Sequence, residues 1–301
     1  MTKPTMATVN IQTQVLDLLR LRWVKASITP PTARDQMPPH RTLPATTPAS
    51  LCETAASKWS PNLKKITLSV IQLWQAFQIK LFGRSFIKKV YLILMAQLLV
   101  TLAFICLFIF ADQIRDWVQT DGFWFYYVSY GTFLVTYIVL ICIPSVRRDT
   151  PGNYICLAVF TLAFSYMVAT ISCYYTTNIV LIMIGITALV CLSISLFAIQ
   201  TKIDFTMCSG LLFVLVMVLF FFGWSCLIVF YTVGYSRILD CVYGALAALV
   251  FGLFLIYDTQ MIVGGRKHEL SPEEYIYGAL QLYLDVVYLF LILLSLFGKS
   301  N

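Results

Sequence analysis

Asp258 and Asp285 are the residues best placed for chemistry in this sequence, because each stands within or next to a long apolar run. Asp258 follows Leu253–Tyr257 directly, and Asp285 lies in the middle of 275–298. An ionisable side chain at membrane depth is costly and marks a functional site by default. If the two carboxyl groups meet, both cannot be ionised cheaply in a low dielectric, so they would titrate as a coupled pair. Two structural alternatives stay open: an interfacial residue at a helix end for Asp258, and a hydrogen-bonded packing residue for Asp285.

The sequence offers little other chemistry. His40 and His268 are far apart, which makes a zinc site unfavourable, and no catalytic triad or glycine-rich phosphate loop is present. Eight of the nine cysteines lie in or beside apolar runs without the spacing of metal ligands, so we interpret them as small apolar residues. We therefore expect no organic cofactor and no enzymatic activity.

The composition excludes a soluble enzyme. Of the 301 residues 59% are hydrophobic and only 12% charged, whereas ordinary soluble domains have about 25% charged residues. Residues 1–89 carry 13 Lys and Arg against 3 Asp and Glu, a balance of +10. Residues 90–301 carry 8 against 11, a balance of −3, and the two add to the formal +7. A basic leader before an apolar body indicates a membrane protein and not a nucleic-acid binder.

The intervals between charged residues predict seven transmembrane helices. A hydrocarbon core of about 30 Å needs about 20 helical residues. The interval 150–201 has 52 residues and would be about 78 Å long as one helix, so it must turn, most readily at the polar stretch 174–178. Continuous apolarity favours helices over a β-barrel, which gives an all-α membrane domain over 81–301. The predicted spans are 90–111, 123–145, 153–174, 178–200, 207–230, 241–263 and 275–298.

The leader, residues 1–80, is predicted to be a disordered basic segment on the cytosolic side. It is rich in Pro, Thr and Ala, although 11–24 could form a short basic amphipathic helix. No signal-peptide core precedes residue 90, so the first span must act as the insertion signal. Seven full spans would place the C-terminus on the opposite face, and a re-entrant last segment would return it to the cytosol. Lys and Arg on the leader's side outnumber those opposite: Arg147, Arg148, Lys202, Arg266 and Lys267 against Arg115, Arg237 and Lys299.

The link before the last span predicts where the final helix starts. Ser271, Pro272 and Glu274 fit the N-cap, N1 and N3 positions of a capping box, which puts the helix start near residue 272. Asp285 would then be about 20 Å along its helix, against about 8 Å from the end of the preceding helix for Asp258. Spacing alone therefore places the two carboxyl groups at different depths.

Several smaller features indicate packing. Gly244, Ala248 and Gly252 repeat at intervals of four, which permits close approach of two helices. Gln97 in the first span and Ser165 with Tyr166 in the third could line a cavity or bond across helices, and the sequence assigns them no role.

Four motifs resemble one known family. They are Arg148–Tyr154 (RDTPGNY), Phe197–Thr206 (FAIQTKIDFT), Tyr257–Gln260 (YDTQ) and Ala279–Asp285 (ALQLYLD), and together they resemble the lifeguard branch of the transmembrane Bax-inhibitor-motif family. The resemblance covers about residues 80–298. The leader lacks the Pro, Gly and Tyr richness associated with that branch, so nothing is carried over to it.

The resemblance implies a seven-helix fold whose last helix is central. It also implies a pH-controlled calcium leak from intracellular stores, in the endoplasmic reticulum or Golgi, and suppression of apoptosis. In a bacterial relative the motifs that hold Asp258 and Asp285 form a paired-aspartate pH sensor. An arginine there closes the pore by pairing with the first aspartate, a latch that falls on Arg147 or alternatively on Arg148. Calcium prefers several oxygen ligands, so Asp258 and Asp285 alone would make only a weak calcium site, which suits passage.

Two other classes of function stay open. One is a non-conducting anti-apoptotic adaptor that binds death-receptor or Bcl-2-type regulators through its cytosolic face. The other is an intramembrane aspartyl protease, which we disfavour because Asp285 follows Leu-Tyr-Leu and not Gly-x-Gly. The expected partners are the lipid bilayer, calcium ions and protons, with apoptosis regulators for the adaptor and no nucleic acid.

Overall fold

The computed structural model describes residues 12–17, 19, 61–120 and 122–298, with only the backbone for 61–84 and for Phe123. The regular elements of these residues are all helical. Predictions for the rest of the leader, including His40 and Cys52, lie outside the described residues. Seven of the helices are long and apolar enough to cross a membrane, which confirms the predicted integral multi-pass fold.

The seven spanning helices agree closely with the predicted intervals. The fifth span is preceded by a 3-10 turn, η1 (Phe205–Cys208). Two short helices that we had not predicted, α4 (Asp112–Thr120) and α6 (Pro144–Arg148), lie in the connections. The spanning helices are α3 (Pro61–Phe110), α5 (Phe123–Cys142), α7 (Gly152–Ser172), α8 (Thr177–Gln200), α9 (Ser209–Thr232), α10 (Arg237–Val263) and α11 (Tyr275–Phe297).

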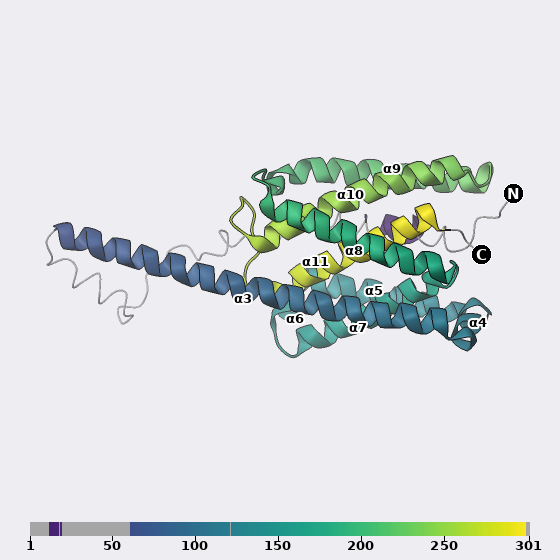
Figure 1. Cartoon of the computed structure of the whole chain (residues 1–301), viewed down its shortest axis with the longest axis horizontal. Helices are drawn as coiled ribbons and strands as arrows, with labels where there is room; N and C mark the ends of the chain where they lie inside the picture. The colour runs from purple at the N-terminus through teal and green to yellow at the C-terminus, as the bar shows by residue number, and fades with distance from the viewer. Residues whose placement is uncertain (1–11, 18, 20–60, 121, 299–301) are drawn as a thin grey trace.

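Three helix boundaries differ from the prediction by three residues or more, and one of them is the start of α10, which lies at Arg237 and not at 241. α3 begins at Pro61 and not near residue 90, and its apolar span is Ser85–Phe110. Residues 61–80, which we had expected to be disordered, continue this helix, and Figure 1 shows it extending beyond the bundle. α5 ends at Cys142 and not at 145, because Pro144 forces the residue before it, Ile143, into an extended conformation.

The spanning helices form two layers of three around α11. One layer, the α7 triad, has α7 between α3 and α5, and the other, the α10 triad, has α10 between α8 and α9. α11 packs against α10, α3, α8 and α7, and Figure 1 shows it between the layers. Its side chains are buried almost continuously from Ile276 to Ile292, whereas α8 and α9 expose large apolar side chains such as Leu189 and Ile228. The predicted central position of the last helix is thereby confirmed.

The two ends of the bundle have different structures. We call the end where α3 enters the span the entry end, which also holds α6 and the connections 201–206 and 264–274. The other, the far end, holds α4 and the first residues of α5, α8 and α10. The polar and charged contacts that bear on function lie at the entry end and in the adjoining half of the bundle.

A short piece of the leader packs at the far end. Residues 12–17 form a helical turn whose Val15 and Leu16 are buried, as is Leu19. Leu16 occupies the space left by the missing side chain of Gly223 on α9. The amphipathic helix predicted over 11–24 is therefore present in part, and its remaining residues lie outside the described ones.

Side-chain hydrogen bonds connect this segment to both triads. Gln12 Nε2 donates to Asp240 Oδ1 on α10 at 2.9 Å, and Gln14 donates to the hydroxyl of Tyr126 on α5. The segment thus bridges α5 and α10 at the end opposite to the one where α3 enters.

Candidate functional site

Asp258 and Asp285 are both completely buried, with 0% of their surface exposed. Asp258 lies on α10 five residues before its end, and Asp285 lies on α11 ten residues after its start. Both helices are spanning segments, and they pack against each other. The two acidic residues singled out from the sequence therefore lie inside the bundle on neighbouring helices.

Two close approaches set the antiparallel register of α10 and α11. A Cβ on Gly244 would lie 2.6 Å from Leu296 Cδ2, and a Cβ on Gly278 would lie 3.3 Å from Ile262 Cγ1. The residue numbers of each pair add to 540, so the same register holds along the whole interface. Asp258 is then level with Leu282, three residues or about 4.5 Å from Asp285 along the axis.

This register removes most of the depth mismatch that the sequence predicted. Part of the mismatch came from the expected helix start near residue 272, and the rest came from taking the two helix ends as level, whereas the end of α10 at Val263 lies level with Tyr277. In the structure α11 begins at Tyr275, and Glu274 is its N-cap without a side-chain capping bond. The predicted capping box of Ser271, Pro272 and Glu274 is wrong, because the Glu274 carboxylate is bound by two arginines.

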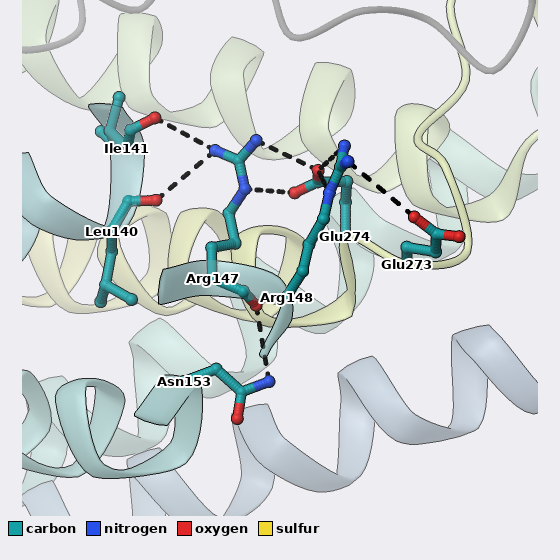
Figure 2. Close-up of polar contacts among 7 residues, drawn as sticks. All are labelled: Leu140, Ile141, Arg147, Arg148, Asn153, Glu273 and Glu274. Carbon is teal, nitrogen blue, oxygen red and sulfur yellow. Dashed lines mark hydrogen bonds and ion pairs between the residues drawn. The ribbon is translucent and has the colours of Figure 1, made fainter. Parts of the chain in front are cut away.

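Arg147 is buried, with 4% of its surface exposed, and ion-pairs with Glu274, of which 1% is exposed. Its Nε contacts Glu274 Oε2, and its Nη2 donates to Glu274 Oε1 at 3.1 Å. Nη1 donates to the carbonyl oxygens of Ile141 at 3.1 Å and Leu140 at 3.4 Å, as Figure 2 shows. These carbonyls belong to the last turn of α5 and have no partner within that helix, so Arg147 caps α5 while it binds α11.

Arg148 binds the same carboxylate from the side that faces solvent. Its Nε and Nη2 lie 2.8 Å and 2.6 Å from Glu274 Oε1. Arg148 is one third exposed, and its Nη1 is 4.0 Å from the exposed Glu273. The two arginines that we predicted as latch residues therefore share Glu274, a partner that the sequence analysis did not assign to them.

α6 presents both arginines to α11. It is a single helical turn between two extended residues, Ile143 and Asp149, and Pro144 is its first residue. Asn153, at the start of α7, donates to the Arg147 carbonyl at 3.5 Å and to the Tyr275 hydroxyl at 3.0 Å. The short helix is thus positioned by contacts with both α7 and α11.

The ring of Tyr277 lies next to Arg147. The Arg147 guanidinium carbon is 5.2 Å from the centre of the ring, a cation–π distance. The Tyr277 hydroxyl is within electrostatic range of both Asp258 and Arg147. Tyr277 therefore responds to the charges of both the arginine cluster and the buried aspartate.

A second polar cluster, at membrane depth, joins α3 and α7 to α11. Gln97 Nε2 donates to Thr161 Oγ1 at 3.0 Å, while Thr101 Oγ1 lies 2.9 Å from Ser165 Oγ and 2.7 Å from the Tyr283 hydroxyl. Gln97 and Ser165 therefore bond across helices, one of the two roles that the sequence left open.

A third cluster ties the connection 201–206 to α10 and to the link that follows it. Gln260 accepts from the Phe205 amide at 2.9 Å and donates to the Ile203 carbonyl at 2.9 Å. Asp204 accepts from the backbone amides of Thr206 at 3.0 Å and Lys267 at 3.1 Å. Burial raises the pKa of Asp204, but a hydrogen bond from the Thr206 hydroxyl, the two backbone bonds and the nearby charge of Arg266 outweigh it and hold the pKa below its ordinary value.

Within the described residues, no three His, Cys, Asp or Glu side chains gather closely enough to hold a metal ion. The calcium site predicted on Asp258 and Asp285 stays a prediction, and at most two carboxylates would form it.

Comparison with known proteins assigns the family. The model of the family described as "Inhibitor of apoptosis-promoting Bax1" matches residues 83–301. The chain belongs to this family. Human Protein lifeguard 3 is 46% identical over 217 residues, which cover 72% of this chain and 69% of the human protein. Bax inhibitor 1 of Schizosaccharomyces pombe is 32% identical over 217 residues, covering 71% of this chain and 76% of the yeast protein.

The family assignment agrees with the resemblance to the lifeguard branch. Mouse Protein lifeguard 3 is also 46% identical, over 219 residues that cover 72% of this chain and 70% of the mouse protein. The description of the matched family names an inhibitor of a protein that promotes apoptosis. Each quoted motif now has a structural role, since Arg148, Gln260, Tyr283 and the 201–206 connection all make the contacts described above.

The sequence did not reveal the roles of several site residues, among them the Arg147 partner Glu274, the connecting residue Thr101 and the loop anchor Gln260. The position of Glu274 in the sequence is compatible with two roles, because an acidic residue beside a spanning helix fits either a helix cap or an ion pair. Thr101 gave no distinctive signal, since a threonine among apolar residues is common in helices.

Proposed function

We propose that this family member is an anti-apoptotic, pH-sensitive calcium leak channel or exchanger of intracellular membranes. The observation that carries the proposal is the complete burial of Asp258 and Asp285 on neighbouring spanning helices about 4.5 Å apart in depth. The role in apoptosis rests on the family description and on the names of the relatives.

In this proposal the carboxyl groups of Asp258 and Asp285 bind both protons and calcium ions. At this depth a carboxyl group is more stable when it is protonated or paired with a cation than as a bare anion. Protons and calcium therefore compete for the pair, and the proton occupancy sets how easily a cation passes. A site of at most two carboxylates binds calcium weakly, which favours passage over storage.

Arg147 belongs to this proposal as the latch. The Arg147 guanidinium packs on the ring of Tyr277, which also feels the charge of Asp258, and in this proposal the latch closes when Arg147 moves toward that aspartate. Arg148 is the more exposed of the two arginines and lies on the solvent side of Glu274, which makes Arg147 the better candidate.

The test is calcium flux through purified protein in liposomes between pH 6 and pH 8. We expect flux above that of empty liposomes, with a pH dependence that Asp258→Asn abolishes. Asp116→Asn on the far-end helix α4 is the matched control, because Asp116 is exposed. Wild-type liposomes no leakier than empty ones at every pH would overturn the proposal and favour the non-conducting adaptor.

We further propose that the entry end faces the cytosol, together with the N-terminus, in the endoplasmic reticulum or Golgi membrane. An N-terminal epitope tag should then bind antibody after selective permeabilisation of the plasma membrane, at one of these organelles. Protection of that tag, with a tag in the 264–274 connection accessible, would overturn the cytosolic N-terminus. It would agree instead with the far-end position of residues 12–17 and of Leu19.

A further inference from the structure

The first part of α3 continues the first span outward from the bundle. The helix is unbroken from Pro61 to Phe110, whereas its apolar span begins at Ser85. Figure 1 shows the remainder, residues 61–84, extending beyond the other helices at the entry end. We call it the outer part of α3, and as a helix it is about 36 Å long. The family match begins at residue 83, so the family assignment carries almost no information about this segment.

The sequence of the outer part is amphipathic when it is placed on a helix. Apolar residues recur at intervals of three and four, which puts them on one face. They are Leu63, Ile66, Val70, Leu73, Trp74, Phe77 and Leu81. Lys65, Gln72 and Ala76 fall on the opposite face, and the other apolar residues, Leu68, Ile71, Ile79 and Phe82, are interspersed with Lys64, Gln75 and Gln78. Such a pattern is typical of a helix that lies at the boundary between an apolar phase and water.

The outer part and the first turn of the span are strongly basic. Residues 61–89 contain six Lys and Arg and no Asp or Glu, and the next acidic residue, Asp112, follows the span. Lys89 Nζ lies 5.3 Å from the centre of the Tyr275 ring, so the basic end of the span is level with the start of α11. We place this end in the cytosol, where the membrane leaflet is anionic. The segment and the leaflet are therefore complementary in charge.

We propose that the outer part of α3 is a membrane-surface helix that binds anionic lipid headgroups at the entry end, with its apolar face in the interface. The span itself holds the segment next to the lipid, which raises the effective concentration of its ligand. To lie along the surface, the outer part must turn away from the axis of the span. Gly83 is the only glycine between Pro61 and Phe110 and stands two residues before Ser85, and sharp helix bends concentrate at Gly and Ser.

A coiled coil with a second copy of the chain is the alternative occupant of the apolar face. The apolar residues from Leu63 to Phe77 fit positions a and d, but Lys80 and Arg84 take the next two of these positions. Coiled coils sustain the pattern over about three to four heptads, which this segment does not. Two parallel copies would also bring uncompensated positive charges together. An anionic lipid surface supplies the opposite charge, so the charge of the segment favours lipid.

Spin labels on the full-length protein in vesicles test the proposal. Val70→Cys places a label on the apolar face and Gln72→Cys places one on the opposite face, in a chain whose nine cysteines are replaced. When phosphatidylserine is added to phosphatidylcholine vesicles, the label at 70 should become shielded from a water-soluble nickel chelate and accessible to oxygen. The label at 72 should stay accessible to the chelate in both kinds of vesicle.

Removal of charge gives the size of the effect. Each basic residue near an anionic surface strengthens binding about fivefold, so K64Q/K65Q should lower the ratio of shielded to accessible label at 70 by about 25-fold. Lys202→Gln is the matched control, because Lys202 is an exposed basic residue at the same end but outside α3. Gly83→Ala should lower the ratio by about two- to fivefold, because alanine favours the unbent helix.

The wild-type chain offers a second test that needs no cysteine replacement. Trypsin cleavage after Lys80 should be largely lost when phosphatidylserine is added to the vesicles. Cleavage after Lys267, which is exposed in the 264–274 connection, should stay the same and controls for the activity of trypsin on these vesicles.

The outcomes separate the two occupants. Equal accessibility of the labels at 70 and 72, or the same shielding with and without phosphatidylserine, would overturn the lipid site. Spin–spin coupling between labels at 70 on different copies would overturn it in favour of the coiled coil. Neither readout measures calcium flux, so a failure of the proposed channel function would leave the lipid site standing.

Discussion

At the residue scale, the stability lost when a charged side chain is removed depends on how deeply its ion pair is buried. Arg147 and Glu274 satisfy each other in the bundle interior, whereas Glu273 is largely exposed at 4.0 Å from Arg148. Removing one member of a buried pair leaves the other charge uncompensated. Loss of the negative charge is therefore expected to reduce the stability much more at Glu274 than at Glu273.

Arg147→Gln should lower the free energy of unfolding by about 3–5 kcal/mol, the usual cost of breaking a buried ion pair. Glu273→Gln should change it by no more than about 0.5 kcal/mol, as for an ordinary surface substitution. Denaturant unfolding in detergent micelles measures both. Equal effects of the two substitutions would show that the buried pair contributes no special stability.

Tyr283 and Tyr288 make a matched test of the intramembrane polar cluster, because both are fully buried on α11. The Tyr283 hydroxyl lies 2.7 Å from Thr101 and 3.4 Å from Ser165, whereas no hydrogen bond is described for the Tyr288 hydroxyl. Tyr283→Phe should therefore destabilise by about 0.6–1.7 kcal/mol, the range for such bonds between membrane helices. Tyr288→Phe should be neutral or stabilising in the same unfolding measurement, and the reverse order would contradict the assignment.

At the scale of the elements, the antiparallel contact of α10 and α11 depends on two glycines and one loop. Gly244 and Gly278 allow the helices to approach and fix the register that brings Asp258 and Asp285 near the same depth. The 201–206 connection, held by Gln260 and Asp204, positions the end of α10 against its neighbours. Changes in these positions should act through helix packing.

Gly244→Ala should destabilise by about 1–3 kcal/mol, because its new methyl group would lie 2.6 Å from the Leu296 side chain. Gly252→Ala is the control: its Cβ would lie 3.6 Å from Ile194, an ordinary contact, and alanine favours the helix by about 0.5–1 kcal/mol. Adding Leu296→Ala to Gly244→Ala should cost less than the sum of the two single changes. Strict additivity in thermal unfolding would argue against this contact.

The lowered pKa of Asp204 makes a prediction about pH. A carboxyl group whose pKa is lower in the folded state stabilises the fold above its unfolded value of 3.8, and this stabilisation is lost as the pH falls through the folded value. Asp204→Asn should thus lower the melting temperature at pH 7, and the difference from wild type should shrink below pH 3.8. A difference that is the same at pH 7 and pH 3 would contradict a charge effect.

At the scale of the whole molecule, much of the architecture follows from the spacing of charges. The spans are predictable because hydrocarbon admits few charges, so Arg147, Lys202 and Glu274 mark the helix ends. The same reasoning identifies Asp258 and Asp285. The pairing of Arg147 with Glu274 was not predictable, because the two residues are 127 positions apart and the sequence before Glu274 also fits a helix cap. The full length of α3 was not predictable in this way. Its first half contains charged residues, whereas the spans were predicted from intervals without charges.

The central claim is that Asp258 and Asp285 act as one unit in the middle of the bundle. The most direct test compares the pH dependence of calcium flux in Asp258→Asn, Asp285→Asn and the double variant between pH 6 and pH 8. If the two residues act as one unit, calcium flux should lose its pH dependence in each single variant. The double variant should then behave like either single variant. Additive effects, with pH dependence retained in one single variant, would show that the two residues work independently and would contradict the account.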